Sequence, residues 1–411
     1  MIRMILTMMA LSGLCLSSLP AAASAKGVHI LLWENDNADV SEEMDKWIAV
    51  FERKNPGIRI TRQHYETETL RSKFLRSSIT GDGAELVYGP NDMAGVFVTA
   101  GVIRPVGDWL KSDQFQAKTL SMATLQGKVW GVPVSEGNHL MLLYNRKMVP
   151  RAPANVEELI RLGQKLADPD RGRYGLAMFQ SEPYWFIPIL HGFGGRVLDR
   201  KGSKVRVTID TPAMEKALAW LVDLKQVPGL LPAECSYDCA RSMFLGEKAP
   251  FYISGDWEVN SMRKKLGDNL GIAPLPRIET TGRSMAPMVS GRFLFVNKSA
   301  AKDKLPAIRK FIDFVLSRQV QNRLAERLLR IPASVQARQA STRSETSVLA
   351  RVVQAAREPV PMPPDVEMRA AWDGMRIMVQ RAMSGTETVK QAVQTGQRAA
   401  DEALKALRQT H

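Results

Sequence analysis

Aromatic side chains stand next to acids and amides at several points of this sequence, mostly where a predicted strand ends. The residues in this arrangement are Trp33 with Asp36 and Asn37, Tyr184 and Trp185 after Glu182, Trp257 after Gly-Asp at 255–256, and Trp372 on a late helix. An indole ring packs on the C–H face of a sugar ring, while carboxylates and amides form hydrogen bonds with its hydroxyl groups. This combination favours a carbohydrate-binding cleft.

The common sequence motifs of catalytic sites are missing from this chain. The chain has no Gly-x-x-x-x-Gly-Lys, His-Glu-x-x-His or Gly-x-Ser-x-Gly pattern, and its five histidines lack the spacing of metal ligands. We therefore expect a binding protein with no cofactor, no metal and no enzymatic activity. A glycosidase or lyase remains an alternative, because sequence spacing does not reveal which carboxylates form a pair in space.

Short apolar strands alternate with amphipathic helices along the chain, which predicts an α/β fold with parallel strands. Ser41 is predicted to cap the first helix, and Pro133 predicts a sheet edge or a strand end. Strands are predicted at 28–33, 58–61, 85–88, 128–134, 140–144, 249–254 and 293–296, and helices at 156–166, 211–225, 305–315, 368–383 and 389–407. Loops at the carboxyl ends of such strands are the expected place for a ligand.

The overall charge first suggests an acidic partner. The chain has 411 residues and a formal net charge of +14, and its length predicts two lobes or domains. Residues 1–25 combine Arg3, an apolar run and Ala-Ser-Ala at 23–25, which is typical of a secretory signal peptide cleaved after Ala25. We therefore expect a periplasmic protein whose dispersed basic residues are solvated surface, with no nucleic-acid partner.

The two cysteines outside the predicted signal peptide are Cys235 and Cys239. Their spacing of four places the Cα atoms within disulfide reach on a helix or a tight turn, and an exported protein meets oxidising conditions. We expect a local disulfide, with two buried thiols as the alternative. A catalytic dithiol is disfavoured because the spacing is not Cys-x-x-Cys.

Several short segments resemble, in order and spacing, family 1 of the bacterial extracellular solute-binding proteins of ABC transporters. The segments are Trp33 and residues 55–58, 81–87, 127–133, 143–145, 182–184, 194–195, 244–249 and 255–257. The similarity is to the maltose- and maltodextrin-binding branch and extends from about residue 28 to the C-terminus. It implies a two-lobed type II periplasmic-binding-protein fold that closes about hinge segments and delivers a sugar to a membrane permease.

The resemblance also implies lobe boundaries and roles for single residues. The N-terminal lobe is expected to comprise residues 26–136 and 291–330, and the C-terminal lobe residues 137–290 and 331–411. Stacking is expected from Tyr184, Trp257 and Trp372. The complete set of candidate ligand-binding residues is Trp33, Asp36, Asn37, Asp92, Glu136, Glu182, Tyr184, Trp257, Arg292 and Trp372. The protein is expected to be a monomer.

Some positions depart from the maltose-binding pattern. Gly89 and Met93 stand where that branch has a tryptophan and an arginine, and residues 34–37 lack its lysine. The N-terminal lobe therefore lacks a stacking ring and a charged donor, which counts against maltose itself. Arg292 and the basic balance suggest, as an alternative, a binder of glycerol-phosphate-like or acidic sugars. The other interpretation of Arg292 is a surface or hinge arginine.

Overall fold

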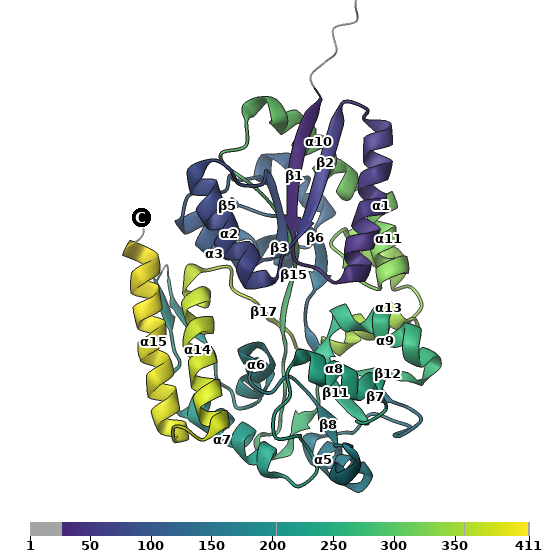
Figure 1. Cartoon of the computed structure of the whole chain (residues 1–411), viewed down its shortest axis with the longest axis vertical. Helices are drawn as coiled ribbons and strands as arrows, with labels where there is room; N and C mark the ends of the chain where they lie inside the picture. The colour runs from purple at the N-terminus through teal and green to yellow at the C-terminus, as the bar shows by residue number, and fades with distance from the viewer. Residues whose placement is uncertain (1–26, 203, 357, 410–411) are drawn as a thin grey trace, which may run out of the picture.

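A computed structural model describes residues 27–202, 204–356 and 358–409 (Figure 1). The predicted signal peptide, residues 1–25, lies outside the described residues. Within those ranges, none of the helices combines the length and apolar character that crossing a bilayer requires. The same ranges contain no cluster of histidine, cysteine and acidic side chains suited to a metal ion.

The larger of two main sheets has seven strands. Their order is β16-β6-β15-β3-β1-β2, and β17 pairs with β15 outside this path. The strands are β1 (Val28–Glu34), β2 (Ile58–His64), β3 (Leu86–Pro90), β6 (Val132–Gly137), β15 (Met288–Val296), β16 (Ile331–Pro332) and β17 (Val360–Pro361). β1 is parallel to β2 and to β3, as the strand-helix-strand order predicts, whereas β15 is antiparallel to β3 and β6.

Helices cover both faces of the larger sheet. Since side chains alternate along a strand, each strand serves two apolar layers. In β1, Ile30 and Leu32 belong to one layer, and Trp33 belongs to the other. The first layer is completed by α1 (Ala38–Lys54), α10 (Leu305–Val315) and α11 (Arg318–Leu328), and the second by α2 (Thr67–Thr80) and α3 (Met93–Thr99).

The smaller sheet has four strands in the order β12-β7-β11-β8. They are β7 (Leu140–Asn145), β8 (Leu176–Ala177), β11 (Phe251–Gly255) and β12 (Leu270–Ala273). One face packs on α5 (Val156–Leu166), α6 (Pro183–Gly192), α7 (Pro212–Gln226), α14 (Val366–Ser384) and α15 (Val389–Gln409). The other face packs on α8 (Tyr237–Leu245), α9 (Val259–Leu266) and α13 (Val348–Ala355). Figure 1 shows the two sheets one above the other, with α14 and α15 side by side along one flank.

Apart from single-turn 3₁₀ helices, the remaining elements are short. They are α4 (Ala117–Ser121), α12 (Val335–Ser341) and three hairpins: β4 (Thr124–Leu125) with β5 (Lys128–Val129), β9 (Leu198–Lys201) with β10 (Lys204–Val207), and β13 (Arg277–Ile278) with β14 (Arg283–Ser284). The predicted strand at 128–134 is thus divided between β5 and β6.

Two local predictions come out differently in detail. The first helix begins at Ala38, with Asn37 as its N-cap, so the prediction that Ser41 caps it was wrong. The Ser41 hydroxyl instead donates to the buried carboxylate of Glu34 at 2.9 Å. Pro133 lies in β6 between two neighbouring strands, but β16 pairs only with Ser135 and Glu136. Pro133 is therefore paired on one side only, which suits a residue without an N–H group.

The chain passes from the larger to the smaller sheet between β6 and β7. Gly137 has φ of +108° there, and a Cβ atom would lie 2.2 Å from Oδ2 of Asp256. Only glycine fits both the conformation and the close approach. The next residue, Asn138, donates its backbone N–H to the same Asp256 oxygen at 3.1 Å. This crossing is thereby fixed to the start of the segment that follows β11.

Candidate functional site

A cavity of about 1060 Å³ lies between the elements of the two sheets. The larger sheet contributes the loops after β1 and β3, the end of β2 and the start of α2. The smaller sheet contributes α6, the start of α8, the turn Asp256–Glu258 and α14. A volume of this size accommodates a ligand of several rings.

Aromatic rings form one side of the cavity. This aromatic wall consists of Phe179, Tyr184, Trp185, Tyr237, Trp257 and Trp372. All six belong to, or pack against, the same apolar core of the smaller sheet. The ring of Tyr184 is central, with centroids 6.2 Å from Trp257 and 6.0 Å from Trp372. The rings therefore form a continuous surface on which the apolar face of a sugar can stack.

Hydrogen bonds to backbone carbonyls fix the polar ends of two of these rings. The Tyr184 hydroxyl donates to the carbonyl of Asn138 at the chain crossing, and the Trp185 indole N–H donates to the carbonyl of Ile253 at 2.7 Å. Burial, followed by the charge of Asp256, raises the pKa of Tyr184 far above its ordinary value. Tyr184 is therefore a neutral group that keeps its proton at any physiological pH.

Carboxylates dominate the opposite side. Asp92 is buried, and its Oδ2 accepts from the indole of Trp372 at 3.2 Å and from Arg71 at 3.3 Å. Its Oδ1 is buried with no hydrogen-bond partner among the described residues. A buried acceptor without a partner is costly unless a ligand or water satisfies it. Since Asp92 also lines the cavity, its carboxylate is a candidate acceptor for a ligand hydroxyl.

A chain of buried charges joins the two sheets beside the cavity. Nη2 of Arg330 is 2.8 Å from Oδ1 of Asp36, and its Nη1 is 3.8 Å from Oδ1 of Asp256. Nε of Arg292 lies 3.5 Å from Oδ2 of Asp36. Burial alone would raise the pKa of Asp36, but the two arginines hold it below its ordinary value. Asp36 therefore stays ionised and binds Arg330 and Arg292.

The two sides also touch directly at the rim. Nδ2 of Asn37 donates to the carbonyl of Trp257 at 3.0 Å, and Nδ2 of Asn260 donates to Asp39 at 2.6 Å. These bonds connect α1 and its N-cap with the segment that follows β11. The structure therefore represents a conformation in which the two halves enclose the cavity together.

Each arginine that lines the cavity contacts a carboxylate. The pairs are Arg62 with Glu34 and Asp45, Arg71 with Glu68 and Asp92, Arg292 with Asp36, and Arg376 with Glu182 and Asp373. Burial raises the pKa of Glu182, although Arg376 opposes the shift. These pairs leave the positive charges compensated within the protein itself.

The cavity brings together eight of the ten predicted ligand-binding residues. They are Asp36, Asn37, Asp92, Glu182, Tyr184, Trp257, Arg292 and Trp372. Trp33 is absent from the lining, because its ring packs inside the larger sheet's core against Tyr65 and Phe74. Glu136 is absent too, because its carboxylate is engaged by Thr119 and Arg338.

Several lining residues were not among the predicted ones, notably Arg62, Arg71, Trp185, Tyr237 and Arg376. A sequence signal exists for some of them. Arg376 comes four residues after Trp372, a predicted stacking residue, and residues at this spacing share a helix face. Tyr237 lies between Cys235 and Cys239, the pair predicted to form a disulfide.

Two α/β halves that share one cavity, aromatic on one side and acidic on the other, define a two-lobed ligand-binding protein. Residues 46–348 match the family model described as bacterial extracellular solute-binding protein, and the chain belongs to this family. The predicted family and two-lobed α/β fold are confirmed. Since the family consists of binding proteins, the prediction that the chain is not an enzyme is also confirmed, and the glycosidase or lyase alternative falls away.

Relatives with known names support the same class. The structure of a maltose/maltodextrin-binding domain from Bdellovibrio bacteriovorus bound to maltotriose superposes with a TM-score of 0.86 at 31% identity, covering 92% of this chain and 100% of that one. A maltotriose-binding protein of Pyrococcus abyssi is 25% identical over 84% of this chain and 76% of its own length. A maltooligosaccharide ABC transporter solute-binding lipoprotein of Streptococcus pneumoniae is 24% identical, with 84% and 82% covered.

Proposed function

We propose that this protein is the substrate-binding component of an ABC importer for a maltooligosaccharide, which it captures by hinge closure and delivers to a membrane permease. The observation that carries the proposal is one cavity lined both by the aromatic wall and by carboxylates, Asp92 among them. Rings for stacking and an acceptor for a hydroxyl are what a sugar needs from its site. The named ligands of the relatives agree with this chemistry.

A neutral sugar suits the cavity better than a phosphorylated or acidic one. Seven carboxylates and four arginines line the cavity, and the arginines are paired as described. Arg292, which had suggested an anionic ligand, contacts Asp36 and donates to Asn35 at 3.2 Å. An anion would therefore meet a cavity lining that carries net negative charge, which repels it.

A ligand panel read by thermal unfolding tests the proposal. Any ligand that binds only the folded protein must raise its unfolding temperature. We expect stabilisation by maltotriose and longer maltooligosaccharides, and none by a β-linked trisaccharide, glucose 6-phosphate or glycerol 3-phosphate. Stabilisation by the phosphates alone would replace the proposal by the acidic-sugar alternative, and no response to any α-linked glucan would refute it.

Salt provides a second, independent prediction. We expect the affinity for maltotriose, measured by calorimetry, to change less than about twofold between roughly 0.1 M and 1 M NaCl, because a neutral ligand gains nothing from long-range charge. An affinity that falls steeply over the same range would indicate an anionic ligand. Potassium chloride in place of sodium chloride is the control for a specific ion effect.

Asp92→Asn is expected to weaken maltotriose binding by about 10- to 100-fold, the range for a hydrogen bond to a charged group. The amide keeps the shape of the side chain but loses the charge that pairs with Arg71 and accepts from Trp372. Calorimetric titration measures the change. Glu136→Gln, at a predicted site residue outside the cavity, is the matched control and should bind as the wild type does. Equal affinities for Asp92→Asn and the wild type would contradict the role of this carboxylate.

Several further features belong to the same proposal. We propose lobes of residues 26–136 with 291–330 and of residues 137–290 with 331–411. Strand pairing supports most of this division, whereas β16 and β17 pair with the larger sheet. The family is extracellular by description. We propose a periplasmic monomer without nucleic-acid partners, cleaved after Ala25, and the intact mass of the exported protein tests the cleavage site.

A further inference from the structure

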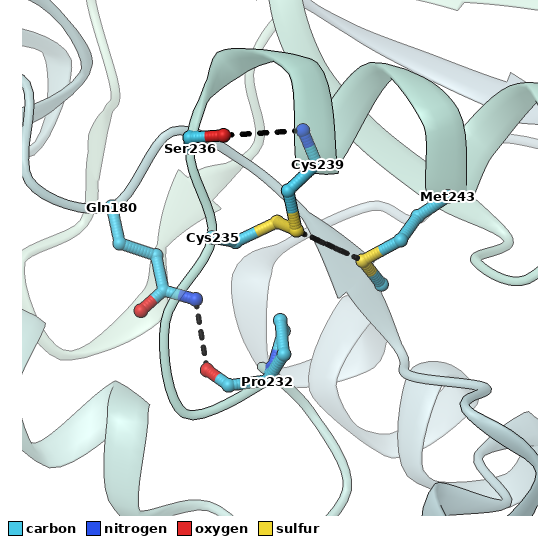
Figure 2. Close-up of a disulfide and its surroundings, with 6 residues drawn as sticks. All are labelled: Gln180, Pro232, Cys235, Ser236, Cys239 and Met243. Carbon is cyan, nitrogen blue, oxygen red and sulfur yellow. Dashed lines mark hydrogen bonds between the residues drawn. A yellow bond between two sulfur atoms is a disulfide. The ribbon is translucent and has the colours of Figure 1, made fainter.

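A disulfide closes the chain at the edge of the aromatic wall. Cys235 and Cys239 are joined by a disulfide, with Cα atoms 5.3 Å apart, at the start of α8 (Figure 2). Cys235 is buried, and sulfur of the disulfide contacts the sulfur of Met243 one turn further along the helix. Of the three residues between the cysteines, Tyr237 and Asp238 line the cavity. The disulfide therefore encloses part of the cavity lining.

The closed loop is anchored on two sides. The Ser236 hydroxyl caps α8 by accepting from the backbone N–H of Cys239 at 3.3 Å. Gln180 is buried, and its side-chain amide donates to the carbonyl of Pro232 at 2.9 Å (Figure 2). Gln180 follows Phe179, another member of the aromatic wall. The backbone N–H of Gln180 also donates to the carbonyl of Cys235 at 3.4 Å, so the loop is tied to the segment that follows β8 as well as to its own helix.

Tyr237 transmits this constraint to Trp257. The indole N–H of Trp257 donates to the Tyr237 hydroxyl at 3.0 Å, and the hydroxyl donates in turn to the buried carboxylate of Glu258. Arg241, one turn along α8, also contacts Glu258 at 3.2 Å. The Tyr237 ring lies 6.1 Å from that of Trp185. The orientation of the Trp257 ring therefore depends on where the first turn of α8 holds Tyr237.

The size of the loop argues for a local role. The chain-entropy contribution of a disulfide grows with the number of residues it encloses, so a five-residue ring constrains the unfolded chain least. By contrast, α8 has nine residues, and a helix this short is poorly stable on its own. Its first turn, where the cavity residues lie, is the part that a crosslink from Cys235 to Cys239 fixes best.

We propose that the Cys235–Cys239 disulfide is a positioning element of the binding cleft. It holds Tyr237 so that the tyrosine hydroxyl orients Trp257, and it thereby sets the affinity for the sugar. This inference rests on the proposed function for its ligand, and on the structure alone for the link between the disulfide and the Trp257 ring.

The test compares the wild type with the double variant Cys235→Ser/Cys239→Ser. Nitrogen-15 spectra of the tryptophan indole groups report the Trp257 N–H without any ligand, and Trp257→Phe assigns its signal. We expect this signal to shift or broaden in the double variant, while the signal of Trp220, which lies outside the cavity, stays in place. An unchanged Trp257 signal would overturn the proposal whatever the ligand is.

Maltotriose titration supplies the second readout. We expect the double variant and Tyr237→Phe each to lose about 3- to 10-fold in affinity, the equivalent of one net hydrogen bond. In the Tyr237→Phe background, removing the disulfide should cause little further loss, because its effect passes through the hydroxyl. An undiminished affinity, or fully additive losses, would contradict the coupling. A wild type that binds no maltotriose would instead refute the proposed function, and the indole spectra would still decide this inference.

Two controls separate positioning from folding. Thr211→Ala removes the N-cap of α7, whose side chain accepts from Met214, and should lower thermal stability while leaving affinity unchanged. Dithiothreitol applied to the folded wild type gives two electrons and two protons to the disulfide, which yields two thiols and the cyclic oxidised reagent. The reduced wild type should match the double variant in its Trp257 indole signal and in its affinity for maltotriose. A difference between the two proteins would mean that the double variant is misfolded.

Discussion

Trp257→Ala is expected to weaken maltotriose binding by about 30- to 1000-fold, the largest loss of affinity that any single change in this cleft should cause. Truncation of a central aromatic anchor has effects of about 2–4 kcal/mol in binding sites. Trp257 contacts Tyr184, Trp185 and Tyr237, so its removal opens the middle of the aromatic wall. Calorimetric titration, with competition where binding is weak, measures the loss.

Trp220→Ala is the matched control. This tryptophan is also half-buried on the core of the smaller sheet, where it packs on Phe193, but it does not line the cavity. The control variant should lose thermal stability and keep its affinity for maltotriose. Should Trp257→Ala bind as tightly as the wild type, stacking on this ring would be excluded as a source of affinity.

Arg330→Met is expected to lower the free energy of unfolding by about 3–5 kcal/mol, the range for removing one partner of a buried ion pair. Arg330 is almost fully buried, and both of its carboxylate partners, Asp36 and Asp256, are more so. Methionine fills similar space without a charge and leaves two carboxylates without their main cation. Denaturant unfolding followed by circular dichroism measures the change.

The pH dependence of this loss follows from the direction of the shift at Asp36. Burial would raise the pKa of Asp36, but Arg330 and Arg292 hold it below that of a free aspartate. A group whose pKa is lower in the folded state stabilises the fold above its unfolded pKa of about 4. This contribution disappears as the pH falls through the folded value. The difference between wild type and variant should therefore be largest at neutral to alkaline pH and should shrink on acidification, because Asp36 takes up its proton first in the variant, where Arg330 no longer opposes burial.

The double variant Asp36→Asn/Arg330→Met tests the pairing itself. Removing both charges takes away the unpaired carboxylate, so it should recover part of the stability that Arg330→Met loses. Equal stability of the single and double variants would contradict the claim that the unpaired Asp36 carboxylate destabilises Arg330→Met. A loss that stays the same at all pH values would exclude Asp36 as the titrating group.

Sequence patterns predicted most helices and strands well, because the spacing of apolar residues in each element matches the face that it buries. The helix at 156–166 and the paired strands around β1 are examples. The same reasoning misplaced Trp33, which lies near the end of a strand and is followed by polar residues. Trp33 occupies an inward position of a sheet that helices cover on both faces, whereas Trp257 lies in a turn beyond its strand. Whether a ring near the end of a strand is buried depends on the helices that pack on that face of the sheet.

Contacts between residues far apart in the chain could not be predicted from local sequence patterns. Asp36 and Arg330 are 294 positions apart, and no local pattern marks Arg330 as the group that bridges to Asp256. The position of Asp92 against Trp372, 280 residues further on, came only from the family resemblance. Gly89 is a position where the sequence departs from the maltose-binding pattern. A Cβ there would lie 2.7 Å from the sulfur of Met93, so a larger residue at position 89 requires Met93 to move, and neither residue lines the cavity.

The one-sided placement of the rings has a kinetic consequence. All six aromatic residues belong to, or pack against, the core of the smaller sheet, whereas Asp36 and Asp92 follow strands of the larger one. We expect a sugar to land first on the rings in a diffusive, concentration-dependent encounter, followed by a first-order step that brings up the carboxylates. Observed binding rates should then level off at high sugar concentration, and the plateau would measure the closing motion directly. Release would run in reverse, with the acidic side withdrawing before the sugar leaves the rings.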